Sequence, residues 1–480
     1  LLMSNLPTLT PITSPWMHEL MAEKSLLDKL LSKYGSPINI HHADSMEENY
    51  KSYQTVFEEF GLKHKIFFAR KANKTKGVVH KAQELGMGID TASLQEYTQC
   101  LEMGIAPEDL IVTAAVKNTK LVEKAVANGS VLILDNVDEC ELVQQVAAEQ
   151  NRKAKIGFRL SGFYCNEKKL YSRFGFDVLD IHKFMIENFV ESNRFDLLEY
   201  KGLHFHLNGY SIEERSMALN QCLSFSQLLS NNGLKTEFID IGGGILMNYL
   251  KYETEWDHFN EQLRNAVTGK ADPITFGNQG LGFERLDDNL YGELKAYPFW
   301  NPVTKGDFLR EILSYKNPVE ESLASLAGNL NIELRMEPGR SLLDQVGITI
   351  AKVAFRKQDS LGDWLIGLEM NMTQMLSGSS DFLLDPFVLY QQEQEEVQPV
   401  DVFFTGAYCL ERDLLLKRKI TLPRLPEVGD VVVFVNTAGY MMHFFESSAH
   451  LFPLATNLIW NRTTEDGKIE LAHFQNDANL

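Results

Sequence analysis

The sequence predicts an α/β protein in which a (β/α)8 barrel is joined to a β-rich domain. From residue 65 onward, short apolar segments rich in β-branched or aromatic residues recur roughly every 20 to 25 residues. Helix-like segments lie between them, and this alternation is typical of a parallel sheet with crossover helices. After residue 345 helical segments become rare, which indicates that a different, β-rich domain begins there.

Eight strands, most of them followed by a helix, account for the predicted barrel. Eight such units favour a closed barrel, and a doubly wound open sheet is the structural alternative. The strands are expected at 65–70, 87–90, 110–114, 131–135, 155–160, 202–207, 237–241 and 332–337. The helices are expected at 74–85, 93–103, 119–127 and 137–149.

Both ends of the chain are expected to build the β-rich domain. Strands are expected at 348–356, 363–368, 401–405 and 430–436, and a strand at 37–41 is expected to join them. Ser45 and Glu48 have the spacing of a capping box, which predicts that a helix starts there. We therefore expect an N-terminal segment at 1–43, a barrel at 44–345 and a C-terminal domain at 346–480.

One segment of the expected barrel, at about 250–330, lacks the alternation of strand and helix. Aromatic residues and glycines gather within it. A long insertion after a barrel strand is usually a lid, a binding loop or an interface element. The alternative interpretation is a surface unit with a small core of its own.

Composition excludes several classes of protein. The chain of 480 residues carries 65 acidic and 46 basic side chains, so its net charge of −19 disfavours binding to nucleic acid or to anionic membranes. No apolar run approaches the roughly 18–20 residues of a membrane helix, and no signal-peptide pattern is visible. The five cysteines are widely spaced without a Cys-x-x-Cys pair, which predicts reduced thiols in a cytoplasmic protein and no metal site.

Residues that carry chemistry stand at the ends of the predicted barrel strands. In a (β/α)8 barrel the active site lies at the carboxyl ends of the strands, so these side chains should meet. Any one of them is weak evidence, and their joint placement is much stronger. They are Lys71, Asp90, Arg159, His204, His206, the triplet Gly242, Gly243 and Gly244, and the group Glu337, Gly339 and Arg340.

The glycine triplet and Arg340 indicate a phosphate site, because glycines let backbone N–H groups approach an anion closely. The alternative for the triplet is a flexible loop. Lys71, in a partly desolvated pocket, should have a lowered pKa and be able to form a Schiff base, whereas the alternative is an ordinary exposed lysine. Glu337 is suited to hold a protonated ring nitrogen, or else it pairs with Arg340 or a nearby lysine.

His204 and His206 are two residues apart on a strand, so they point to one face. We find no third metal ligand at a telling spacing, so one histidine is expected to stack on a planar cofactor and the other to belong to the core. A lysine, a phosphate cradle, an acidic residue and a stacking aromatic together indicate a pyridoxal phosphate (PLP) site.

The sequence resembles the PLP-dependent decarboxylases of the alanine-racemase-like fold, the family of diaminopimelate, ornithine and biosynthetic arginine decarboxylases. Motifs similar to those of the family occur in the right order between about residues 37 and 445. They are 67–73 (FFARKAN), 88–96 (GIDTASLQE), 172–175 (SRFG), 202–206 (GLHFH), 240–244 (DIGGG), 337–340 (EPGR), 406–409 (GAYC) and 438–440 (AGY).

The resemblance implies roles for individual residues. Lys71 would hold PLP, His206 would stack on its ring and Glu337 would keep the ring nitrogen protonated. Cys409 would come from the partner subunit of a head-to-tail homodimer and protonate the substrate Cα after CO2 leaves. The phosphate would be surrounded by Gly242, Gly243, Gly244, Gly339, Arg340 and Tyr440.

Two departures from the family pattern bear on the substrate and the phosphate. The loop after His206 is one residue longer than in the family pattern, which leaves the phosphate role of Ser211 open. Leu410 replaces the acidic residue that follows the cysteine in relatives and binds the distal amine of the substrate. Either Glu411 or Asp413 takes over that role, or the substrate has no free distal ammonium.

The second alternative gives a sharper hypothesis, in which the side-chain nitrogen of the substrate is already acylated. Carboxylate-siderophore pathways use such decarboxylases on citryl-capped diamino acids, for example a citryl-ornithine. Two other functions remain open. A racemase shares the barrel, and a decarboxylase-like protein can bind a partner without turnover. Glu337 and Cys409 fit decarboxylation better than either.

Overall fold

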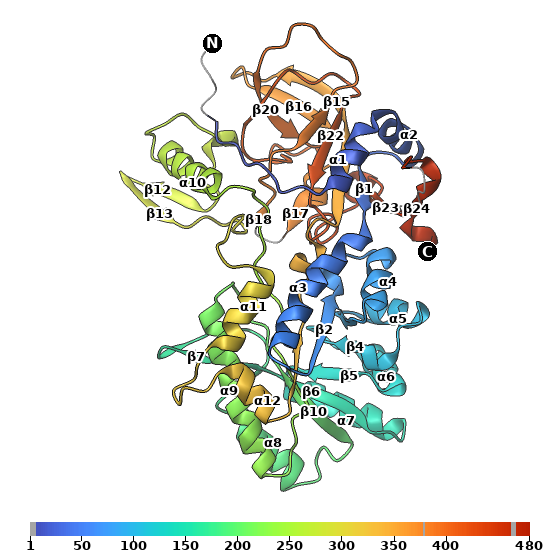
Figure 1. Ribbon diagram of the computed structural model, residues 1–480, viewed down its shortest axis with the longest axis vertical. Coiled ribbons are helices and arrows are strands. Elements are labelled where there is room, and N and C mark those ends of the chain that lie inside the picture. The colour runs from blue at the N-terminus through green and yellow to red at the C-terminus, as the bar shows by residue number, and fades with distance from the viewer. Residues whose placement is uncertain (1–5, 378–379, 462–466) are drawn as a thin grey trace.

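The computed structural model describes residues 6–377, 380–461 and 467–480, and it contains two large sheets (Figure 1). A barrel surrounded by helices forms one half of the molecule, and a β-rich sheet forms the other half (Figure 1). None of the described helices is long and apolar enough to cross a bilayer.

The barrel strands run parallel and close on themselves. The sheet order is β10-β11-β14-β2-β3-β4-β5-β6, and β10 also pairs with β6, which completes the ring. The closed barrel is therefore confirmed, and the open-sheet alternative is wrong. Its strands are β2 (His64–Ala69), β3 (Gly88–Thr91), β4 (Leu110–Val112), β5 (Val131–Leu134), β6 (Ala154–Ser161), β10 (Leu198–His204), β11 (Phe238–Asp240) and β14 (Glu333–Met336).

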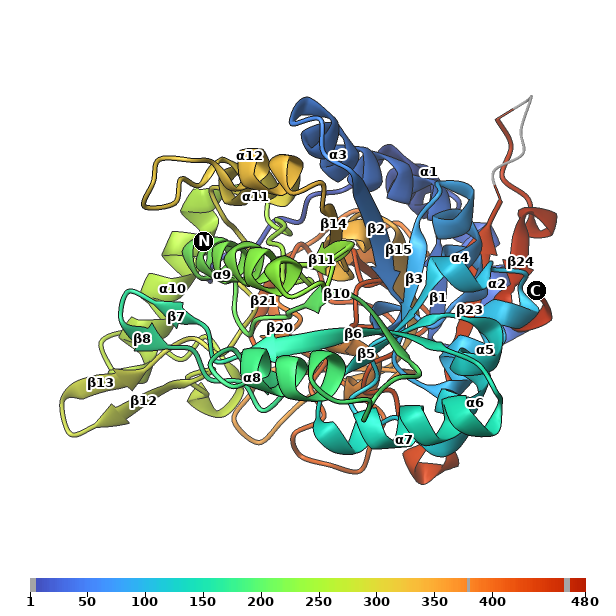
Figure 2. The ribbon, with the colours of Figure 1, turned by 90° about the horizontal axis from the view of Figure 1, so that it is seen from below.

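Amphipathic helices cover the outside of the barrel (Figure 2). Several begin where a polar side chain accepts a backbone N–H of the first turn, as Ser93 does for α5, Asn118 for α6 and Asn136 for α7. Inside the barrel, Phe67 and Phe238 belong to a small apolar layer. The helices are α3 (Met46–Glu59), α4 (Lys76–Glu84), α5 (Leu94–Glu102), α6 (Thr119–Asn128), α7 (Val137–Glu149), α8 (Ile181–Met185) and α9 (Ile212–Asn231).

The capping-box prediction at the start of α3 is wrong. The helix does begin at Met46, but Ser45 already has helical backbone angles and its side chain caps no N–H of the helix. Ser45 closes a 3-10 turn, and its hydroxyl bonds the Nδ1 atom of His42 at 2.9 Å. A cap needs an extended residue at this position, and the preceding turn prevents it.

Both ends of the chain build the second sheet, as predicted. β1 (Ile38–His41) pairs with β15 (Gly347–Gln358) antiparallel and with β23 (Thr456–Trp460) parallel. Helices α1 (Pro15–Ala22) and α2 (Lys24–Tyr34) share a core with these strands. The remaining strands are β16 (Trp364–Leu368), β19 (Phe387–Leu389), β20 (Val400–Thr405), β21 (Ile420–Leu422), β22 (Val431–Val435) and β24 (Phe474–Asn476).

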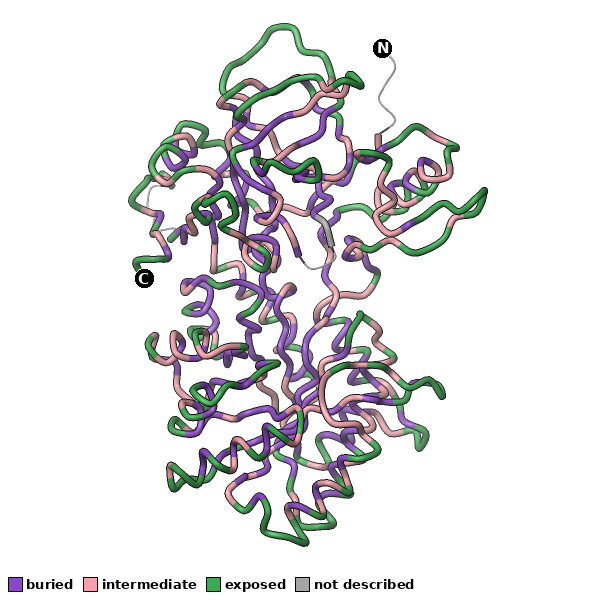
Figure 3. Tube along the Cα trace, turned by 180° about the vertical axis from the view of Figure 1, so that it is seen from behind, coloured by how far each residue is buried: buried purple, intermediate pink, exposed green. Residues whose placement is uncertain are grey.

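The segment at about 250–330 divides between the two halves. Helix α10 (Glu253–Val267) and the hairpin of β12 (Phe283–Leu286) and β13 (Asn289–Gly292) project from the side of the molecule and share a core with the second sheet (Figure 1). The hairpin is largely exposed (Figure 3). Helices α11 (Lys305–Ser314) and α12 (Leu323–Asn329) instead pack in the helical layer of the barrel.

Three further short strand pairs complete the description. β7 (Tyr164–Cys165) pairs with β8 (Lys168–Lys169), and β9 (Phe176–Asp177) adds to the end of β6. β17 (Leu376–Ser377) pairs with β18 (Ser380–Asp381). The first two pairs extend the loop after β6, which forms part of the site described next.

Candidate active site

A cavity of about 510 Å³ lies at the carboxyl ends of the barrel strands. Segments that follow four barrel strands and segments of the second sheet line it together. This is the face at which the sequence placed the site. The polar side chains that line the cavity include Arg159, Arg173, His206, Glu337, Arg340 and Tyr440.

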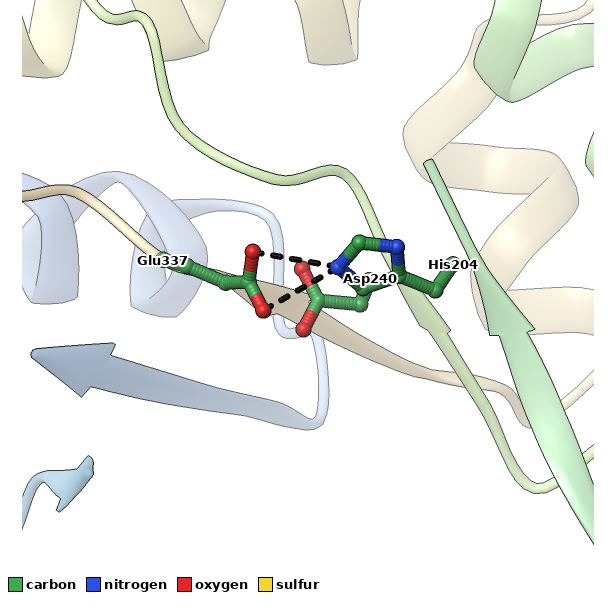
Figure 4. Close-up of side chains that lie close together, drawn as sticks. All are labelled: His204, Asp240 and Glu337. Atoms are coloured by element: carbon green, nitrogen blue, oxygen red, sulfur yellow. Dashed lines mark hydrogen bonds and ion pairs between the residues drawn. The ribbon is translucent and has the colours of Figure 1, made fainter. Parts of the chain in front are cut away.

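Three buried polar side chains, His204, Asp240 and Glu337, lie close together (Figure 4), and Glu337 also lines the cavity. The Nε2 atom of His204 lies 3.1 Å from each carboxylate oxygen of Glu337. Asp240 stands beside them, and one of its oxygens accepts the N–H of Gly242 at 2.8 Å. His204 is buried, as expected of a core histidine, and its ring also contacts Glu337. All three side chains are buried, so their charges are not screened by water.

Burial decides the protonation of this group. Burial, together with nearby Asp90 and against the opposing charge of Lys71, raises the pKa of Glu337 to about 8. It also raises the pKa of Asp240 well above its usual range and lowers the pKa of His204 to about 4. His204 is therefore neutral near pH 7. Its Nδ1 atom and one oxygen of Asp240 have no hydrogen-bond partner among the described residues.

Lys71 follows β2 in a 3-10 turn, on the same face of the barrel. Lys71 as a whole is exposed to solvent. Its amine is surrounded by charged groups, among them Asp90 and Glu337. Burial alone would lower the pKa of Lys71, but Tyr440, Asp90 and Glu337 favour the ammonium and leave the pKa raised. The predicted lowering is thus wrong, because the surrounding acidic groups outweigh desolvation.

The glycine triplet turns tightly behind His206. A side chain on Gly242 would come within 2.5 Å of the Phe205 carbonyl oxygen, and one on Gly243 within 2.7 Å of the Glu337 carbonyl oxygen. Residues larger than glycine therefore do not fit between the two loops. The N–H of Gly243 donates to Nδ1 of His206 at 3.0 Å.

This hydrogen bond and burial fix the state of His206. Burial, with Lys71 and Arg159 nearby, lowers the pKa of His206 well below its usual value. Since Nδ1 accepts a hydrogen bond, the neutral ring carries its proton on Nε2. Arg159 donates to the His206 carbonyl at 3.4 Å, and its guanidinium lies 4.3 Å from the Phe174 ring centre.

Arg340 lies among three tyrosines, Tyr249, Tyr297 and Tyr440. It donates to the Tyr249 hydroxyl at 2.8 Å, and its guanidinium lies 4.3 Å from the centre of the Tyr297 ring. Tyr440 comes from the second sheet, and its N–H donates to the Ala72 carbonyl at 2.8 Å. The hydroxyl of Tyr440 lies so close to Gly339 that a side chain there would meet it at 2.8 Å.

Several predicted site residues lie elsewhere. Of the residues that the structure describes, those lining the cavity do not include Cys409, Leu410 or Glu411, which are all exposed. Asp413 is buried, and its two carboxylate oxygens accept the N–H groups of Met372 and Tyr408 at 2.8 Å each. Asp413 therefore shapes its own loop.

Two further predicted residues are engaged in local structure. Ser211 caps helix α9 by accepting the N–H of Glu214 at 3.1 Å. Asp90 is buried and accepts a hydrogen bond from the Thr113 hydroxyl. Its charge nevertheless reaches the site, since it raises the pKa of both Glu337 and Lys71.

Sequence reasoning missed four residues that build the site. Asp240 could have been found, because it ends a strand two residues before the glycine triplet. Tyr249 and Tyr297 belong to the segment without clear periodicity, where no pattern indicated their direction. Arg215 on α9 gave no signal, because a single arginine on a helix is usually exposed.

The model of the pyridoxal-binding domain of the pyridoxal-dependent decarboxylases matches residues 43–277. The chain is similar to this family of decarboxylases over about half of its length, the part that forms most of the barrel. A protein named y4yA from Sinorhizobium fredii is 28% identical over 435 residues, which cover 89% of this chain and 88% of that protein. Diaminopimelate decarboxylase from Aquifex aeolicus is 22% identical over 94% of this chain and 92% of its own length.

Solved structures agree in fold with this pyridoxal-dependent decarboxylase. The diaminopimelate decarboxylase of Helicobacter pylori, in complex with L-lysine, superimposes with a TM-score of 0.65 at 20% sequence identity. The match covers 90% of this chain and 93% of that chain. The chain is thus a PLP-dependent amino-acid decarboxylase, with the alanine-racemase-like fold that the motifs indicated.

The residues of the cavity fit the cofactor of the family. Glu337, at the buried end, has a raised pKa because burial outweighs the opposing charges of Lys71 and Arg159, and a ring N–H would be a suitable partner. At the other end, close-packed glycines and Arg340 suit a phosphate. His204, Asp240 and Glu337 each offer one atom that could bind a metal ion, and these atoms lie within 4.8 Å of one another (Figure 4). The other residues of the cavity match PLP.

Proposed function

We propose that this decarboxylase removes the α-carboxylate of a diamino acid whose side-chain nitrogen is acylated, such as a citryl-ornithine. In this proposal Lys71 holds the cofactor through its amine. Glu337 holds a proton at the ring nitrogen, and the neutral His206 ring covers one face of the cofactor. When bound, the cofactor supplies a protonated ring that accepts the electron pair left at Cα as CO2 departs.

The phosphate end of the proposed site consists of Gly242, Gly243, Gly244, Gly339, Arg340 and Tyr440. Arg340 supplies the positive charge, and its contacts with Tyr249 and Tyr297 hold the guanidinium in place. Of the glycine triplet, Gly242 and Gly243 donate their N–H groups to Asp240 and His206, which leaves the N–H of Gly244 for the anion.

Cys409 of the partner subunit is proposed to complete the reaction. In this chain the Cys409 thiol is exposed and does not line the cavity, which suits a residue that serves a second subunit. The bond between Cα and the carboxylate breaks and CO2 leaves with neither of the bonding electrons. The thiol then gives its proton to Cα and is reprotonated from water. This proposal requires a homodimer with shared sites.

The charge of the cavity supports an acylated substrate. Among the described lining residues Glu337 is the one carboxylate, whereas Arg159, Arg173 and Arg340 bring three guanidinium groups. Arg173 lies 3.9 Å from the Phe174 ring centre and forms no ion pair with a described carboxylate. A free distal ammonium finds no suitable partner on this wall, whereas the carboxylates of a citryl group do.

The segment that contains Leu410, which the partner subunit would contribute, also supports an acylated substrate. Leu410 is 46% exposed and occupies the position from which the relatives' acidic residue would reach the distal amine. Asp413 has both of its oxygens engaged by backbone N–H groups, so only Glu411 is left as a carboxylate for a free amine. The absence of charge at Leu410 is the single observation that carries the proposal.

Release of CO2 by the PLP-loaded protein tests the proposal. The panel holds lysine, ornithine, arginine, meso-diaminopimelate and citryl-ornithine. We expect release from the capped compound alone, and Leu410→Glu should shift the ratio of kcat/KM towards the free diamino acids by about tenfold. Leu454→Glu, another exposed leucine of the second sheet's half, is the control. Release from a free diamino acid at a higher rate would contradict the acylated substrate.

A further inference from the structure

Arg215 is a buried cation that holds two loops of the active site. It lies on α9 and is 0% exposed. Its guanidinium donates to the carbonyl of Gly209 at 2.7 Å, to that of Gly243 at 3.2 Å and to that of Ser211 at 3.2 Å. A longer bond of 3.3 Å reaches the Leu207 carbonyl. One side chain thus joins the loop after β10 to the loop after β11.

The charge of Arg215 is not neutralised by a counter-ion. It forms no ion pair with any described carboxylate, and its partners are neutral carbonyls. Burial lowers its pKa to about 10, so the guanidinium still carries its charge at neutral pH. Burying an unpaired charge is costly, so a cation kept in this way points to a function that uses it.

Arg215 also orients the peptide groups of both loops. In a trans peptide the C=O and the following N–H point in opposite directions. When Arg215 binds the carbonyls of Gly209 and Gly243, the N–H groups of Tyr210 and Gly244 point to the opposite side. Both residues line the cavity, and neither N–H donates to a described group. These donors are therefore free for an anion in the cavity.

The loop that Arg215 holds is the one that is longer than the family pattern. Three of its carbonyls, those of Leu207, Gly209 and Ser211, bind this guanidinium. Gly244 approaches so closely that a side chain there would overlap the guanidinium. The added residue and the buried arginine thus form one unit.

We infer that Arg215 is a positioning residue of the phosphate site, which aims the N–H groups of Tyr210 and Gly244 at the phosphate and adds a fixed positive charge behind them. The inference rests on the proposed placement of the phosphate between the glycine triplet and Arg340. It assigns to this chain a cation that acts through the loops and touches no ligand.

Binding of pyridoxal phosphate and of pyridoxal to the cofactor-free protein tests this role, with tryptophan fluorescence as the readout. Arg215→Met should raise the Kd of pyridoxal phosphate by at least about tenfold and that of pyridoxal by less than about twofold. If the Kd values of both compounds rise by the same factor, Arg215 only supports the loops and the inference is wrong. If neither Kd changes, the inference is also wrong.

Three further variants make the test decisive. Arg418→Met removes another buried arginine, which binds Leu383 and Pro7 carbonyls in the other half of the molecule, and should not change the preference. Arg340→Met should abolish the preference, and if it does not, the placement of the phosphate is wrong rather than the role of Arg215. If Arg215→Met does not fold, Arg215→Gln should show the same selective loss, and a preference like that of the unchanged protein would overturn the role.

Discussion

Glu337 and His204 illustrate how single residues are tuned by their surroundings. Each is buried, and burial disfavours the charged form of both, so the pKa of the acid rises to about 8 and that of the histidine falls to about 4. Near pH 7 a protonated Glu337 carboxyl and a neutral His204 ring are therefore favoured, and a hydrogen bond joins them. Such a carboxyl gains most from a cationic ring nitrogen.

The shifted pKa values predict how the stability of the cofactor-free protein depends on pH. Folded Glu337 keeps its proton up to about pH 8, whereas the unfolded chain loses it near its ordinary value of 4.5, so its stabilising effect fades as the pH rises. His204 acts oppositely, and its contribution is lost only as the pH falls from 6.5 towards 4. Between pH 6.5 and 8 the Glu337 effect dominates.

We expect the free energy of unfolding to fall across that window, by at most about 1.4 kcal/mol per pH unit for this one group. Glu337→Gln should flatten the fall, while Glu333→Gln, at the start of the strand that Glu337 follows, should not. Urea denaturation at pH 6.5, 7.25 and 8 measures the slope. A slope that is the same in both variants would contradict the shifted pKa of Glu337.

Glu337→Gln should also separate chemistry from binding. An amide cannot keep the ring nitrogen protonated, so we expect kcat to fall on the order of 100-fold. The Kd of the cofactor should change by only a few-fold, because the phosphate contacts remain. Steady-state CO2 release and cofactor titration give the two values. A variant with normal kcat would remove Glu337 from the mechanism.

At the scale of elements, the site depends on how closely the loops after β10, β11 and β14 (His204, Asp240 and Met336 are their last residues) approach one another. Glycine at position 243 permits this approach. The strands set the direction in which each loop leaves the barrel, and Gly243 leaves room for the loops to pack closely. The geometry of the phosphate site therefore depends on all three loops.

Gly243→Ala should force two of these loops apart, since the new methyl group would meet the Glu337 carbonyl oxygen at 2.7 Å. Overpacking of this kind costs about 1–3 kcal/mol, so we expect the Kd of the cofactor to rise about tenfold or more. Gly328→Ala on α12 has its nearest neighbour at 3.8 Å and is the control. Cofactor titration of both variants is the measurement, and equal affinities would refute the close approach.

The elements also show what the sequence could and could not predict. The barrel strands were found because both of their faces are buried and their apolar runs are short and regular. Helices α11 and α12 have only 10 and 7 residues and escaped detection within an irregular segment. The pKa of Lys71 depends on Asp90 and Glu337, which are distant in sequence, so no local pattern indicated its direction.

At the scale of the whole molecule, the two halves meet at the site. The N–H of Tyr440 donates to the Ala72 carbonyl, and the Asn73 amide donates to the Ala438 carbonyl at 3.0 Å. The second sheet is thus bonded to the turn that carries Lys71. Cys409 lies on the same half but outside the cavity, which leaves the site of a single chain without the proposed proton donor.

Mixing of subunits tests whether the site is shared. Lys71→Ala and Cys409→Ala should each be inactive alone. If each site takes its lysine and its cysteine from different subunits, an equal mixture should recover about a quarter of the activity, because half of the dimers are mixed and each has one intact site. CO2 release after joint refolding is the readout. No recovery, with mixed dimers present, would contradict the shared site.

Lys71 is proposed to hold the cofactor at the carboxyl end of the barrel. Borohydride reduction of the PLP-loaded protein, followed by peptide mapping, identifies the lysine that binds it. We predict the reduced cofactor on the peptide that contains Lys71, with none elsewhere in the chain. A label on another lysine, such as buried Lys117, would contradict the claim.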